Sequence, residues 1–169
     1  MEGLKQIEVY RQNASYARQH GEMAVYQRSN VANVACRNAI EEAIRQNFDG
    51  MRLDVRGAKK VLETFGAPRV LLVLANTVQQ KAWDGRFSME NRKWAQTYEL
   101  PVDEELAGDR RSAYVVQSHP AVLDGFIQQT RRLVQERELQ QNKVCLQDKL
   151  HLAKLPAQPR KSRAAAQER

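Results

Sequence analysis

The sequence PRVLLVLANTVQQK, which spans residues 68–81, is the best candidate for the core of the fold. Pro68 suits the first turn of a helix, where its missing amide hydrogen costs nothing, and Gly66 suits the end of a preceding helix. The apolar run Val70–Leu74 is too short for periodicity to decide, so a buried strand is the alternative. Because Pro68 and the polar continuation give the segment the length of an ordinary helix, we predict a central, buried helix here.

Helical patterns also precede this segment. Apolar residues recur at three- and four-residue steps over residues 4–20, and a longer pattern runs from about residue 22 to residue 47. The Phe-Asp-Gly sequence at residues 48–50 ends the second pattern, because glycine adopts the backbone angles that turns need. Asp54 can then cap a short helix that runs to about Phe65.

The remainder of the chain is also predicted to be mainly helical. Ser88 can cap a short helix that carries Trp94, residues 100–112 suit an exposed connection, and residues 114–116 allow one short strand. Ser118-His119-Pro120 is a helix-start signature that leads into a long helix ending near Leu155. Past Leu139 its apolar spacing thins, which fits either a helix that projects and packs on a partner chain, as in a homodimer, or a frayed amphipathic end.

These patterns predict a mainly α fold with a compact domain of about five or six helices over residues 1–155. Residues 156–169 are predicted to be a disordered basic tail, because they hold four basic residues and one acid. The tail supplies +3 of the net charge of +7, which leaves the folded part at about +4. This charge favours contact with nucleic acid or with an acidic protein face.

Composition and motifs exclude several classes of protein. No apolar run approaches the roughly 20 residues that cross a bilayer, and the first ten residues lack the apolar stretch of a signal peptide. We therefore expect a cytoplasmic protein with no membrane partner. Cys36 and Cys145 lack the spacing of a redox or zinc pair, and no nucleotide-binding glycine loop occurs, so no metal and no cofactor are predicted.

Residues 83–88, WDGRFS, are the first candidate for a contact site. Arg86 lies between Trp83 and Phe87, and Trp, Tyr and Arg dominate the binding energy of many interfaces. The alternative is a turn that only holds two helices together. If the turn is a contact surface, we expect that surface to comprise Trp83, Arg86, Phe87 and Trp94. If the protein instead binds nucleic acid, we expect phosphate contacts from Arg160, Lys161 and Arg163 of the tail.

His119 and Asp124 form the second candidate for a contact site. Ser118 and His119 suggest a nucleophile and a base, but neighbours at a helix start point in different directions and no third group orients them. Capping and packing explain these residues better, because serine and proline both have structural roles at a helix start. We therefore predict that the protein is not an enzyme, with catalysis by His119 and Asp124 as the weaker alternative.

Several blocks of the sequence resemble an uncharacterised domain family that is found on conjugative elements and prophages of gut Firmicutes. The resemblance covers about Tyr10 to Leu133. It rests on residues 16–18 (YAR), 39–44 (AIEEAI), 47–51 (NFDGM), 73–77 (VLANT), 83–88 (WDGRFS) and 118–126 (SHPAVLDGF).

The resemblance implies a mobile-element context rather than a mechanism. Small proteins of such elements often protect them, which implies an inhibitor that binds a host defence protein or ribonucleoprotein, such as a CRISPR nuclease. The basic charge disfavours mimicry of DNA, because a mimic needs an acidic surface. The alternative is an accessory factor that binds DNA or RNA during transfer or regulation of the element.

Overall fold

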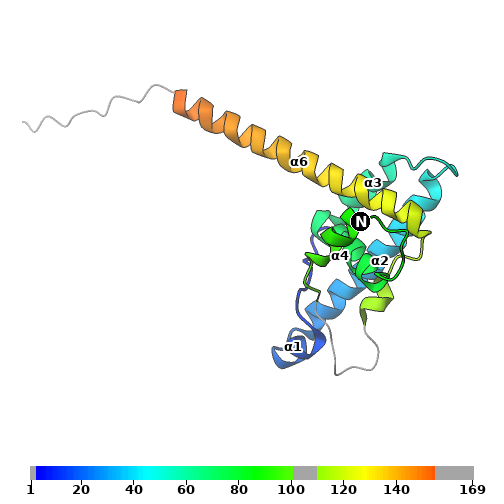
Figure 1. Cartoon of the computed structure of the whole chain (residues 1–169). Helices are drawn as coiled ribbons and strands as arrows, with labels where there is room; N and C mark the ends of the chain where they lie inside the picture. Colours follow the sequence, from blue (N-terminus) through cyan, green and yellow to red (C-terminus); the bar gives the residue numbers. More distant parts are fainter. Residues whose placement is uncertain (1–2, 101–109, 155–169) are drawn as a thin grey trace, which may run out of the picture. The chain divides into compact units, whose positions relative to one another are not determined.

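The computed structural model describes residues 3–100 and 110–154 (Figure 1). The elements are α1 (Ala14–Gln19), α2 (Met23–Asn47), α3 (Val55–Phe65), α4 (Ala67–Gln80), α5 (Met89–Gln96), the 3-10 helix η1 (Arg110–Tyr114) and α6 (Pro120–Lys154). This confirms the mainly helical fold class and the long C-terminal helix. The predicted tail, with Arg160, Lys161 and Arg163, lies outside the described residues.

The chain divides into two units within α6, one that ends at Val134 and one that begins at Gln135. We call the described residues up to Val134 the body and residues 135–154 the distal helix. No single helix in the described ranges is long and apolar enough to cross a membrane, and α3 and α4 reach that apolarity only as a pair bent by 117°.

Helix α4 is the centre of the body. Val70, Val73 and Leu74 are fully buried, and α4 contacts α2, α3, α5 and η1. Its start follows local rules, because Gly66 has a φ of +84° and Pro68 lies in the first turn, where no amide donor is needed. The predicted central helix is confirmed, and the alternative of a strand at residues 70–74 is wrong.

Helices α2, α3 and α6 supply most of the remaining core. Ile40, Leu62 and Leu123 are fully buried in the same apolar cluster as α4. Helices α2 and α3 approach closely at Gly57, where an added Cβ would lie 2.9 Å from the Nδ2 atom of Asn47. The absence of a side chain at this position therefore sets the separation of the two helices.

The prediction for the N-terminal segment is wrong in part, because the helix expected over residues 4–20 is confined to α1. Asn13 caps α1 by accepting from the amide of Tyr16, and residues 8–12 before the cap are not helical. The backbone carbonyls of Ile7 and Glu8 accept from the Nη2 atom of Arg69 at 2.8 and 3.2 Å. A helix would occupy these carbonyls itself, whereas a buried guanidinium must find acceptors.

Residues 114–116 also differ from the prediction, because they form no strand. The amide of Val116 donates to the Oγ1 atom of Thr77 at 3.0 Å, and its carbonyl accepts from Lys81 at 3.1 Å. The carbonyl of Val115 accepts from Arg37 of α2 at 3.0 Å. Side chains of α2, of α4 and of Lys81 just after α4 therefore satisfy this backbone, which leaves no need for a neighbouring strand.

Candidate contact surface

Residues 81–88, which we call the Trp83 turn, are held by the carboxylate of Asp84. Its Oδ1 atom accepts from the backbone amide and the Nε atom of Arg86 at 3.0 and 2.9 Å, and Oδ2 accepts from Nη2 at 2.7 Å. The side chain of Asp84 is only 5% exposed. Hydrogen bonds from Arg86 lower the pKa of Asp84 to about 2. The turn is therefore fixed rather than loose.

Asp124 attaches the Trp83 turn to the first part of α6. Its Oδ1 atom accepts from the backbone amide of Ser88 at 2.9 Å and from the Nδ2 atom of Asn91 at 2.8 Å. Ser88 in turn caps α5 by accepting from the amide of Asn91 at 3.2 Å, as predicted. Asp124 therefore works as a structural acceptor between α5 and α6.

The two aromatic residues of the Trp83 turn point to different environments. Phe87 is 2% exposed and belongs to the core, so its prediction as a contact residue is wrong: the turn needs an apolar anchor on its inner side. Trp83 is 80% exposed, and the side chain of Arg86 is 53% exposed. The turn thus presents Trp83 and Arg86 to solvent while Phe87 holds it to the body.

Trp94 is more sheltered than Trp83. It is half-buried against the core, and the guanidinium of Arg131 lies 5.2 Å from the centre of its ring. Arg131 is held there by donating to the Oδ1 atom of Asn91 at 2.8 Å. Trp94 therefore offers only part of its ring to a partner.

His119 and Asp124 both have structural partners. His119 is exposed, and its Nδ1 atom accepts from the amide of Ala121 at 3.2 Å, which caps the start of α6. Asp124 accepts from Ser88 and Asn91 instead. A general base must be free to receive a proton from a substrate, whereas the oxygen of Asp124 that accepts these two bonds is already engaged.

A second surface feature was missed by sequence reasoning. A hollow of about 520 Å³ lies between the loop after α2 and the first half of α6. Met51, one of its lining residues, is 91% exposed, and the Nε2 atom of Gln129 joins α6 to the loop by donating to the carbonyl of Leu53 at 2.8 Å. Its lining residues are Phe48, Met51, Leu53, Ala121, Val122, Gly125, Gln128, Gln129 and Arg132.

Comparison with known proteins places this body in a family. A family model described as "Protein of unknown function (DUF3849)" matches residues 9–135, which is more than half of the chain. The chain belongs to this family. No curated protein matches the chain, and no solved structure matches it.

The DUF3849 match ends where the body ends. The family model stops at residue 135, and the body stops at Val134. The resemblance over Tyr10 to Leu133 is thereby confirmed. The Trp83 turn, Asp124 and the hollow beside Met51 all lie within the DUF3849 domain, whereas residues 136–154 of the distal helix lie outside it.

The described thiols and carboxylates of the DUF3849 domain do not gather into a metal-binding group. In the ranges 3–100 and 110–154, no three His, Cys, Asp or Glu residues come together in a way that could hold a metal ion. Cys36 is fully buried, and burial raises the pKa of its thiol to about 12, whereas Cys145 on the distal helix is exposed.

Proposed function

We propose that this DUF3849 protein is a non-enzymatic, cytoplasmic binding protein of a bacterial mobile element. In this proposal it inhibits a host defence complex, such as a CRISPR nuclease, by direct binding through the Trp83 turn. The observation that carries the binding role is the 80% exposure of Trp83 on a turn that Asp84 holds in one conformation.

The physical case for binding rests on preorganisation. An exposed Trp is costly to leave in water and has a large area to bury, and Arg86 beside it adds planar donors. Because the turn is fixed before a partner arrives, little conformational entropy is lost when it binds. Side chains with these properties at the centre of an interface typically supply most of its affinity.

The case against catalysis rests on the carboxylates near the turn. Asp84 is bonded to Arg86, and Asp124 to Ser88 and Asn91, so the structural role of each accounts for its position. The mobile-element context comes from the sequence blocks of the family resemblance. Within that context, a basic protein suits a protein or ribonucleoprotein target better than it suits mimicry of DNA.

A plasmid-interference assay tests the proposal. Host cells whose CRISPR nuclease targets a plasmid are transformed with and without expression of the protein, and the assay is repeated across a panel of defence systems. We expect the wild-type protein to restore transformation in one of them, and Trp83→Ala to lose that effect. Loss of a central Trp typically weakens binding by about 2 to 4 kcal/mol, or roughly 30- to 1,000-fold.

The matched control is Val31→Ala, which removes a side chain that is 70% exposed on α2, away from the turn in sequence. It should leave the effect unchanged, and circular dichroism should show both variants folded. Normal interference by every system in the presence of the wild-type protein would rule out the inhibitor role.

The solvent face of α3 favours a second candidate, an accessory factor that binds DNA or RNA. Lys59 and Lys60 on α3 are exposed, and Arg52 is exposed just before the helix. Exposed basic residues bind phosphates through release of counterions, which makes the affinity fall steeply with salt. The basic tail, outside the described residues, would add to such contacts.

Binding to labelled DNA and RNA over a series of salt concentrations separates the two candidates. The accessory-factor role predicts tight, salt-sensitive binding that drops with Lys59→Glu/Lys60→Glu and with deletion of residues 156–169. A protein-directed inhibitor keeps its effect on transformation after the same deletion. Weak binding that neither change alters would remove the second candidate.

A further inference from the structure

The distal helix carries a narrow apolar stripe. Leu139, Leu146 and Leu150 are 60, 60 and 59% exposed. Because helical residues are about 100° apart, these three side chains lie within about 40° of one another around the axis. In heptad terms they occupy core positions, together with Glu136, Lys143 and Ala153. We call Leu139, Leu146 and Leu150 the leucine stripe.

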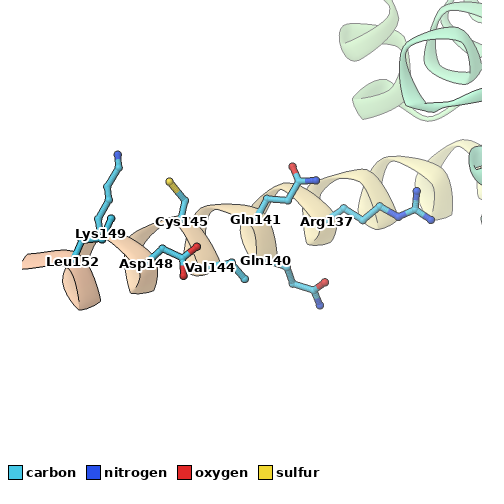
Figure 2. Close-up of a pocket in the computed structure, with 8 residues that line it drawn as sticks. All are labelled: Arg137, Gln140, Gln141, Val144, Cys145, Asp148, Lys149 and Leu152. Atoms are coloured by element: carbon cyan, nitrogen blue, oxygen red, sulfur yellow. The ribbon is translucent and has the colours of Figure 1, made fainter. Parts of the chain in front are cut away.

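The opposite side of the distal helix is mixed in character. Figure 2 shows an open region whose lining residues all come from this one helix, with Val144 and Cys145 pointing to different sides. One helix cannot enclose a cavity, so this region is a helix face. Charged and amide side chains separate its apolar residues, whereas Lys143 is the charged residue that interrupts the leucine stripe between Leu139 and Leu150.

We propose that the leucine stripe pairs with the leucine stripe of a second copy of this chain, in antiparallel orientation. The charges along the distal helix favour both this partner and this direction. The start of the distal helix carries Glu136, Arg137 and Glu138, a net charge of −1, and its end carries Asp148, Lys149 and Lys154, a net charge of +1. An antiparallel pair places the acidic start of each helix beside the basic end of the other, and it also opposes the two helix dipoles favourably.

The core positions favour the same direction. A parallel pair would stack Glu136 on Glu136 and Lys143 on Lys143, which are like charges in contact. The antiparallel register with Leu139 opposite Leu150 of the second copy places Lys143 opposite Leu146 instead. Lysine tolerates that position, because its aliphatic stem covers leucine while the ammonium group reaches water.

The oligomeric state of the full chain tests the pairing. Sedimentation equilibrium from micromolar to millimolar concentration should show a monomer–dimer equilibrium. Leu146→Gln, which keeps a good helix former, should weaken the dimer by at least about a hundredfold, because a pair of leucines is lost. The matched control Val144→Gln, on the opposite side, should leave the equilibrium unchanged. A monomer at every concentration, or equal effects of both variants, would overturn the proposal.

Cross-linking tests the direction. In a Cys145→Ser background, one preparation carries Glu136→Cys and a second, tagged preparation carries Ala153→Cys. The antiparallel register predicts mixed disulfides between the two preparations after mild oxidation. Disulfides confined to copies of the same preparation would show a parallel pair and overturn the register. Neither result depends on binding to a defence complex, so this proposal and the proposed function fail separately.

Discussion

Replacing Arg69 by Met should destabilise the body, because it removes the hydrogen bonds that hold the N-terminal segment to the rest of the body. Arg69 is 1% exposed, and burial lowers the pKa of its guanidinium. Its Nη1 atom donates to the carbonyl of Ser29 at 2.9 Å and to the side chain of Asn33. Its Nη2 atom donates to the carbonyls of Ile7 and Glu8, so one side chain joins α4, α2 and residues 7–8.

The expected loss follows from the acceptors that remain. Met fills much of the volume and removes the cost of burying a charge, but it leaves Asn33 and the carbonyls of Ile7 and Glu8 without this donor. An unsatisfied buried polar group costs about 1 to 3 kcal/mol, so with some relaxation the loss is about 3 to 5 kcal/mol. For a body of this size the melting temperature should fall by roughly 10 to 20 °C.

Urea unfolding followed by circular dichroism gives the free energy, and hydrogen exchange locates the change. The amide of Tyr10, which donates to the Oγ atom of Ser29 at 3.0 Å, should exchange much faster in Arg69→Met. The unfolding free energy of Arg69→Lys should fall between those of the wild type and Arg69→Met, because one ammonium group cannot bond both sets of acceptors. A loss below about 1 kcal/mol with unchanged exchange at Tyr10 would refute the role given to Arg69.

Three further predictions concern the body and the thiols. The folded-state pKa of Asp84, about 2, lies below its ordinary value of 3.8, so its stabilising effect is complete above pH 4 and is lost as the pH falls towards 2. The difference in unfolding free energy between wild type and Asp84→Asn should therefore shrink over that range, and a constant difference would contradict this. Gly57→Ala should destabilise the body by about 1 to 3 kcal/mol through its contact with Asn47, whereas Gly125→Ala, which meets nothing within 4 Å, should stabilise it by about 0.5 to 1 kcal/mol. Thermal unfolding of both variants checks the opposite signs. A thiol reagent should react rapidly with Cys145 in the native protein and reach Cys36 only after unfolding, because Cys36 is buried and its pKa is raised to about 12.

The sequence was most informative where the interactions are local. Asp54 and Ser88 accept from amides two and three residues later. Gly66 follows the end of α3, and Pro68 lies in the first turn of α4. Such signals depend only on the residue type and its position relative to the helix end. They were sufficient to predict α3, α4 and the start of α5.

Interactions between distant residues explain the errors. The segment before α1 is set by Arg69, 61 or 62 positions away from Glu8 and Ile7, and residues 115–116 are set by side chains of α2 and α4. The contact site shows the same limit. Trp83 and Phe87 are both aromatic residues of one turn, so the local sequence does not show which of them faces the core. The hydrogen bond from the amide of Ser88 to Asp124, 36 positions later, helps to fix this.

The proposed function depends on direct binding of another macromolecule by the Trp83 turn. Tagged wild-type protein, Trp83→Ala and the control Val31→Ala are used to capture partners from host lysate after nuclease digestion, and retained proteins are quantified by mass spectrometry. We expect one defence complex to be retained by the wild type and the control and lost with Trp83→Ala. Capture that disappears on digestion of nucleic acid, or that Trp83→Ala leaves unchanged, would contradict direct binding through the Trp83 turn.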